Sequence, residues 1–339
     1  MLRWTLKVVA VVLVAGTAAP LAAQDVTWSS RRPDGEAPLG VREARTLDAG
    51  ELEITYRFRQ LNSKGVWVRS DSLPLNIALL SYPIVPTEKV DERHMVTVAY
   101  APTGSLTLTG SFSYTNRERR QVNDQLLLYE TATREFGDVE VSALYKFLET
   151  GGYRGQLQAG VTLPTGPEKA FDNTPASPSE ALPYDMRVGA GVVGFKPGIT
   201  ASAQNEHGSV GAQIKGLIYT GTNDVGYRPG NLLDVSGWAA VRLNDYFSVS
   251  ARVHWLNWGA IEGADPALDS TRDPANDGFF LAGERVDLPL GINFYMPEGS
   301  GFLAGNRLSF EAILPVSRDY EGPQMGLDWG IVAGWTVSF

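Results

Sequence analysis

The chain has 339 residues, which is enough for one large domain or two small ones. Its 38 aspartate and glutamate residues outnumber its 29 lysine and arginine residues, and the net charge of -9 argues against nucleic acid, whose phosphates attract cationic surfaces. The sequence contains no cysteine, so disulfides, thiol catalysis and thiolate metal sites are excluded.

Residues 1–23 have the pattern of a signal peptide. Arg3 and Lys7 form a positive head, "VVAVVLVAGTAA" is the apolar stretch, and "LAA" before Gln24 is a cleavage site of the expected kind. The apolar stretch is shorter than the about 20 residues that a membrane-spanning helix needs. We therefore predict an exported protein. Its residues 24–50, rich in proline, glycine and arginine, are expected to stay in the periplasm or to enter the fold as a plug.

From Glu51 onward, apolar and polar residues alternate, as in "ELEITYRFRQL" and "SLTLTGSFSY". Such alternation over about 9–11 residues is typical of a strand in a sheet with one apolar face. The pattern predicts twelve strands, at 51–61, 92–101, 104–115, 136–148, 155–164, 185–204, 209–220, 232–243, 247–258, 284–297, 306–315 and 326–339. The sixth is the least regular, and Pro197 in "GFKPG" predicts a bulge there because proline cannot donate to the ladder.

The connections between these strands alternate between short and long. This pacing is typical of an all-β fold, the transmembrane antiparallel β-barrel, with tight periplasmic turns and long extracellular loops. The expected location is therefore the bacterial outer membrane, with its lipid and lipopolysaccharide as partners. A soluble β-sandwich also alternates, but nothing in that fold requires alternating loop lengths.

The chain ends in "GWTVSF", with apolar residues alternating up to Phe339. In a barrel the last strand must pair with the first, because unpaired backbone groups in lipid cost several kcal/mol each. The C-terminal strand is therefore expected to close the barrel. The ending also resembles the terminal strand of bacterial outer-membrane proteins, whose last aromatic residue is recognised by the barrel-assembly machinery. Phe339 is the predicted assembly signal.

The face opposite the apolar residues carries charges of both signs, which a barrel tolerates where they face water or one another. Two interpretations remain open: a water-filled conduit, favoured for a barrel of this size, and a network that fills a narrow lumen. The predicted pore-lining residues are Glu53, Arg57, Arg59, Glu140, Lys146, Lys215, Asp234, Arg252, Asp287, Arg307, Glu311 and Asp328.

Two of the predicted extracellular loops need comment. The first contains the apolar stretch "LPLNIALLSYPIV", which either gathers a hydrophobic solute at the mouth or folds inward and buries itself. The mouth residues are Leu73, Leu75, Ile77, Leu79 and Tyr82. Another loop, "EGADPALDSTRDPANDG", has aspartates four apart, which does not match the ligand spacing of an EF-hand, and a solvated acidic loop is expected. No cofactor or metal site is predicted.

Catalysis is not expected. His254 and Ser250 share a strand face, but strand rise separates them by about 13 Å, and no GxSxG elbow is present. The alternatives to a channel are a phospholipase-like barrel enzyme and a structural or adhesive barrel with a plugged lumen.

The stretch "GVTLPTG", residues 160–166, resembles the "LPTG" segment of outer-membrane barrels of the phenol meta-pathway and transporter family. Similar strand and loop pacing covers most of residues 51–339. The resemblance implies passage of small hydrophobic or aromatic solutes, and it carries no catalytic motif.

Overall fold

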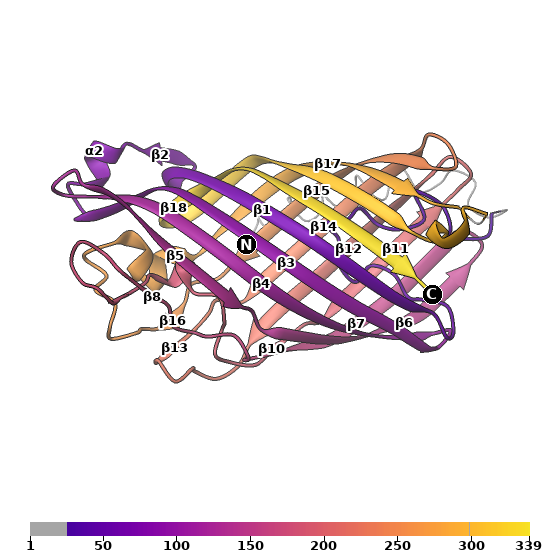
Figure 1. The fold of residues 1–339 in the computed structure, drawn as a ribbon, viewed down its shortest axis with the longest axis horizontal. Coiled ribbons are helices and arrows are strands. Elements are labelled where there is room, and N and C mark those ends of the chain that lie inside the picture. The colour runs from indigo at the N-terminus through magenta and orange to yellow at the C-terminus, as the bar shows by residue number, and fades with distance from the viewer. Residues whose placement is uncertain (1–25, 298) are drawn as a thin grey trace, which may run out of the picture.

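The computed structural model describes residues 26–297 and 299–339, so the predicted signal peptide lies outside the described residues. Its main feature is a 14-stranded antiparallel sheet that closes on itself into a barrel (Figure 1). No described helix is long and apolar enough to cross a membrane.

Eleven elements form the ring and three pair only at its margins. The ring contains β1 (Leu52–Arg69), β3 (Ile84–Thr103), β4 (Leu106–Asn123), β6 (Val139–Thr150), β7 (Tyr153–Leu163), β11 (Gly198–Gln204), β12 (Gly208–Tyr219), β14 (Leu232–Arg242), β15 (Phe247–Trp258), β17 (Gly283–Tyr295) and β18 (Arg307–Ser338). The elements outside it are β2 (Asp71–Leu73), β5 (Leu128–Phe136) and β10 (Gly194–Phe195).

The element β18 is two barrel strands in one. Its residues 307–320 pair with β17, and its residues 320–338 pair with β1. Every pairing around the ring is antiparallel, and a closed ring of antiparallel pairs must contain an even number of strands. Counting β18 as two strands turns the eleven elements into twelve crossings of the barrel wall, which confirms the predicted fold class and strand number.

The C-terminal strand closes the barrel, as predicted. Leu52 N donates to Phe339 O at 3.1 Å, and Phe339 N donates to Leu52 O at 2.8 Å. The side chain of Phe339 is 71% exposed on the outer surface of the barrel. The final residue is therefore a paired member of the sheet.

The side-chain pattern of the wall is inverted relative to a soluble protein. Along β4, Thr107 and Ser111 are buried, whereas Leu108 is 46% and Phe112 is 56% exposed. A soluble sandwich would place the threonines in water and the aromatic ring in the core. A polar interior with an apolar outer surface is what a lipid environment requires.

The two ends of the barrel differ. At the end that holds Phe339, called here the short-turn end, four of the connections span two to four residues, and the β17–β18 connection contains the 3-10 turn η4 (Gly301–Leu303). At the opposite, long-loop end, β1, β3 and β4 run for 18 to 20 residues and extend beyond their short neighbours (Figure 1). The β4–β5 hairpin and the short helix α2 (Leu75–Ala78) project there.

Two strand boundaries differ from the prediction. The connection expected at 62–91 is largely strand, because β1 and β3 continue to pair as far as Lys64 and Glu88. The sixth strand, expected at 185–204, is regular only from Gly198. Residues 184–193 hold the 3-10 turn η1 (Tyr184–Met186) and irregular backbone, and Pro197 lies at the predicted irregularity, between β10 and β11.

Three loops interlock at the long-loop end, and we call residues 164–193, 221–231 and 259–282 the loop cap. The cap contains β8 (Phe171–Asp172), β9 (Glu180–Ala181), β13 (Tyr227–Arg228), β16 (Glu262–Gly263), η2 (Pro274–Asn276) and η3 (Gly278–Leu281). β13 pairs with β16, which joins two of the loops, and Tyr227 Oη donates to Glu168 O, which joins the third.

Candidate functional site in the barrel lumen

Residues 26–50, called here the luminal segment, lie inside the barrel. The segment begins at the short-turn end, where Trp28 N donates to Gly151 O. It reaches the middle of the wall at Arg42, whose carbonyl accepts from Gln213 and Lys215, and returns to the short-turn end at Gly50. Its partners come from strands on all sides of the ring, so the segment occupies the lumen over this part of its length.

Glu43 is the central anchor of the luminal segment. Its carboxylate accepts from Lys196 Nζ at 3.2 Å, from Ser142 Oγ at 2.9 Å and from Gln158 Nε2 at 2.7 Å. Burial alone would raise the pKa of Glu43, but the charges of Lys196 and Arg42 lower it to about 2. Glu43 also has a φ of 57°, a conformation that is uncommon outside glycine, and these contacts hold it there.

Gly40 lies against a buried ion pair. Its N–H donates to Glu311 Oε2 at 2.5 Å, and Glu311 pairs with Arg252 Nε at 3.3 Å. A Cβ at position 40 would lie 2.1 Å from an Arg252 nitrogen and 2.4 Å from the Glu311 carboxylate. Any side chain at position 40 would therefore have to displace this buried ion pair.

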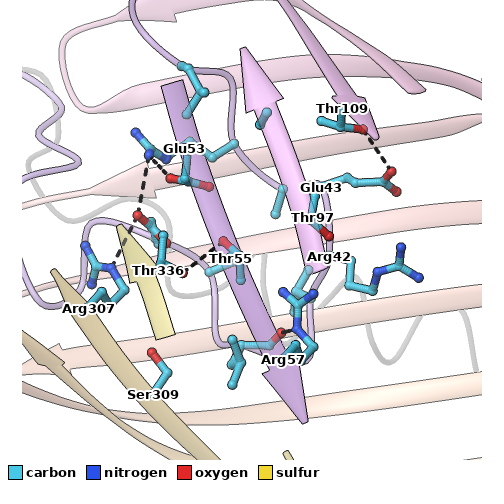
Figure 2. Close-up of a pocket in the computed structure, with 18 of the residues that line it drawn as sticks. Arg42, Glu43, Glu53, Thr55, Arg57, Thr97, Thr109, Arg307, Ser309 and Thr336 are labelled. Carbon is cyan, nitrogen blue, oxygen red and sulfur yellow. Dashed lines mark hydrogen bonds and ion pairs between the residues drawn. The ribbon is translucent and has the colours of Figure 1, made fainter. Parts of the chain in front are cut away.

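Arginines fix the remainder of the segment. Arg42 pairs with Glu140 at 2.7 Å, and Arg45 pairs with Glu53 from β1. Arg307 of β18 donates to three backbone carbonyls of the segment, those of residues 30, 32 and 33. Arg42, Glu53 and Arg307 line a small internal space of about 80 Å³. Figure 2 shows them together with Glu43, which is linked to Thr109, and Arg57, which is linked to the backbone of the segment.

A larger cavity of about 470 Å³, the central cavity, lies next to Gly40 and Arg42 on the side toward the long-loop end. Part of its wall is apolar, formed by Leu61, Leu217, Leu232, Leu256, Trp258, Ile313 and Val332. The remainder is charged, with Arg42, Arg57, Arg59, Arg93, Lys196, Lys215, Arg252 and Arg285 against Glu140, Asp234 and Asp287. The luminal segment thus forms the floor of a mixed polar and apolar chamber.

Eleven of the twelve predicted pore-lining residues contact the luminal segment, line a cavity or pair with a residue that does. Glu53, Arg57 and Arg307 line the small space, and Lys146 lies near Trp28 at the short-turn end. The central cavity is lined by Arg57, Arg59, Glu140, Lys215, Asp234, Arg252 and Asp287, and Glu311 pairs with Arg252.

The prediction for Asp328 is wrong. A register shift between β1 and β18 occurs at this point, and Leu327 rather than Asp328 pairs with Ser63. Leu327 is buried with Ile313 and Val332, whereas Asp328 is exposed. Simple alternation fails here because a bulge exchanges the faces of neighbouring residues.

The predicted mouth residues divide between the two interpretations that the sequence left open. Leu73, Leu79 and Tyr82 pack against a buried cluster at the loop end of β1 and β3. Leu75 and Ile77 are 41% and 46% exposed. About half of this apolar stretch therefore buries itself, and the remainder forms an exposed surface on α2.

The loop expected to be a solvated acidic loop is solvated only in part, because Asp269 is exposed whereas Asp265 and Asp273 are buried. Asp273 pairs with the fully buried Arg119 of β4, and Asp265 pairs with Arg187 at 2.7 Å. Arg119 also reaches Asp185 at 3.2 Å, so β4 is tied to two loops of the cap. In the described residues, no group of three or more histidine or carboxylate side chains is placed to hold a metal.

His254 contacts carboxylates. Its Nε2 lies 3.2 Å from Asp234, and its Nδ1 lies 3.6 Å from Asp287. Within the described chain, Ser250 Oγ is buried without a hydrogen-bond partner. The two side chains therefore do not form a nucleophile and base pair.

Several residues of the site were not predicted. Glu43, Gly40 and Arg42 lie in a stretch without periodicity, so their positions had no signal in the sequence. Lys196 pairs with both Glu43 and Glu140, and it was missed because it lies at the break in the sixth strand. Arg93 was also missed, although alternation along β3 placed it on the inner face.

Comparison with solved structures supports the fold. The COG4313 outer membrane channel from Pseudomonas putida F1 is 12% identical, with a TM-score of 0.58 over 88% of this chain and 99% of that one. More distant are the KdgM porin (9% identical, TM-score 0.41, covering 85% and 99%) and a Pseudomonas aeruginosa FadL homologue (9% identical, TM-score 0.39, covering 86% and 89%). No protein-family model and no curated protein matches the chain. The chain has the fold of an outer-membrane β-barrel.

Proposed function

We propose that this chain is a channel of the bacterial outer membrane for small solutes. We further propose that its luminal segment closes this channel. The short-turn end would face the periplasm and the loop cap would face the outside, as alternating loop lengths suggest. Outer-membrane lipid, lipopolysaccharide and the barrel-assembly machinery are the partners implied by this location.

The observation that most supports the proposal is how the luminal segment is held. Among the described residues, only two backbone hydrogen bonds join it to the wall, from Trp28 N to Gly151 O and from Gly50 N to Ala101 O. All its other polar contacts with the wall involve side chains. The segment could therefore leave the lumen without breaking any strand pairing, and its departure would connect the central cavity with the short-turn end.

The solute is proposed from the walls of the central cavity. Its mixed lining of leucine, tryptophan and charged side chains suits a small molecule with an apolar part, which includes hydrophobic and aromatic compounds. We propose no enzymatic role, because His254 is engaged by two carboxylates and its cross-strand neighbour Ser236 accepts a hydrogen bond from Arg252.

The proposal can be tested by tethering the luminal segment. Ser248 Oγ donates to Pro33 O at 2.9 Å, so Pro33→Cys with Ser248→Cys places two thiols near each other in a chain that has no other cysteine. In planar bilayers, the oxidised double variant should remain closed, and reduction should produce discrete conductance steps. The single variant Ser248→Cys, treated identically, controls for the oxidant.

Equal conductance in the oxidised and reduced states would contradict closure by the luminal segment. Absence of both conductance and liposome uptake of small solutes, with a barrel that still shows a heat-dependent gel shift, would overturn the channel itself.

A further inference from the structure

The distribution of charge in the central cavity is opposite to that of the whole chain. The chain has a net charge of -9, yet eight basic and three acidic residues line this cavity. Several of these bases have partners in the luminal segment or wall, such as Arg42 with Glu140 and Arg252 with Glu311.

Arg57 and Arg93 remain without a carboxylate partner in the part of the chain that the structure describes. Arg57 Nε donates to the carbonyl of Leu39, and Arg93 Nε donates to Thr115 Oγ1 at 3.3 Å. Both contacts are to neutral oxygens, so neither guanidinium forms an ion pair within the described chain. Buried or half-buried charges are normally paired.

The neighbouring residues increase this excess. Arg59 and Arg93 are direct cross-strand partners of β1 and β3, and like charges directly opposite each other are unfavourable. The carboxylate of Asp91 is shared between Arg59 at 3.1 Å and Arg117 at 2.5 Å. Arg57 and Arg59 of β1 and Arg93 of β3 thus line one cavity, and only Arg59 among them forms an ion pair in the described chain.

The opposite side of the cavity carries an apolar patch beside charged residues such as Lys215 and Asp234. Leu217, Leu232 and Trp258 are register partners on β12, β14 and β15. In the ring these strands lie about half a turn away from β1 and β3. A molecule in the cavity would therefore meet guanidinium groups on one side and this aliphatic and aromatic patch on the other.

We propose that the central cavity binds small organic anions, with the anionic group between Arg57, Arg59 and Arg93 and the apolar body against Leu217, Leu232 and Trp258. Guanidinium groups bind carboxylates through paired, charge-assisted hydrogen bonds, which suits a monocarboxylate with a ring or a short aliphatic body. This inference names the solute class of the proposed channel and rests on that function for its biological meaning, although binding itself can be measured alone.

The test compares benzoate with benzamide, its neutral isostere, by titration calorimetry with the purified full chain in detergent. Benzoate should bind at least about 10-fold more tightly than benzamide. The double substitution Arg57→Gln with Arg93→Gln should weaken benzoate binding by about 10-fold or more. The control Arg120→Gln removes the same kind of charge from an exposed side chain outside the cavity, and should leave benzoate binding unchanged.

The outcomes separate this inference from the proposed function. Equal affinity for benzoate and benzamide, no benzoate binding, or benzoate binding unaffected by the double substitution in a folded barrel would overturn the anion site, even if the barrel conducts. Arginine-dependent benzoate binding in a barrel that passes no solute would keep the anion site and overturn the channel.

Discussion

The clearest single-residue prediction concerns Glu43→Gln, which keeps the shape of the anchor and removes its charge. The pKa of Glu43 is lowered from 4.5 to about 2 by the surrounding cations, in spite of burial. That shift corresponds to about 3 kcal/mol that favours the held segment at neutral pH. Neutralising the side chain should therefore increase the population of released segment by roughly 100-fold, at 1.4 kcal/mol per factor of ten.

The assay uses a cysteine placed at Val41, which is 6% exposed, as a reporter of release. Maleimide labelling of Val41→Cys should be roughly 100-fold faster in the Glu43→Gln background. The matched control is Glu88→Gln, the same change at a half-exposed ion pair outside the lumen. Equal labelling rates with and without Glu43 would refute the anchoring role.

The same residue predicts a pH dependence. The pKa of Glu43 is lower in the held segment than its usual 4.5, so its stabilisation is present above pH 4.5 and is lost as the pH falls toward 2. Labelling of Val41→Cys should therefore accelerate on acidification in the parent background, after correction with a free thiol. It should change little in the Glu43→Gln variant.

Three further predictions concern other parts of the barrel. Deletion of Phe339 should sharply lower the fraction of heat-modifiable, membrane-assembled protein without changing synthesis, because it removes the terminal aromatic residue and its pairing with the first strand; normal assembly would contradict this. Arg119→Met should leave the buried Asp273 unpaired, at a cost of about 3–5 kcal/mol, and make the loop cap sensitive to protease on intact cells. With the lumen opened by removal of the luminal segment, Arg57→Glu combined with Arg59→Glu should shift ion selectivity toward cations in reversal-potential measurements.

The architecture of the wall could be predicted because it depends on local alternation. In "SLTLTGSFSY" the apolar residues fall on alternate positions, and the structure exposes Leu108, Phe112 and Tyr114 among them. Closure by Phe339 followed from the need to pair every backbone group in lipid. Alternation along β3 would also have predicted Arg93 as a residue of the inner face, because its neighbour His94 faces outward.

The contents of the lumen could not be predicted in the same way. Glu43 meets Lys196, which is 153 positions away in the sequence, and residues 26–50 have no periodicity from which their path could be read. Bulges also defeat the pattern, as the exchange of Leu327 for Asp328 on the inner face demonstrates. The pairing of Asp273 with Arg119 depends on how the loops fold over β4, which has no local signature either.

The measurement that tests the account most directly is single-channel conductance of the full chain beside a variant that lacks residues 26–47. Both must first show a heat-dependent gel shift, which establishes a folded barrel. We predict rare openings of the full-length barrel and frequent, discrete conductance steps in the shortened one. Identical conductance in the two proteins, or none in either, would contradict a channel closed by its own luminal segment.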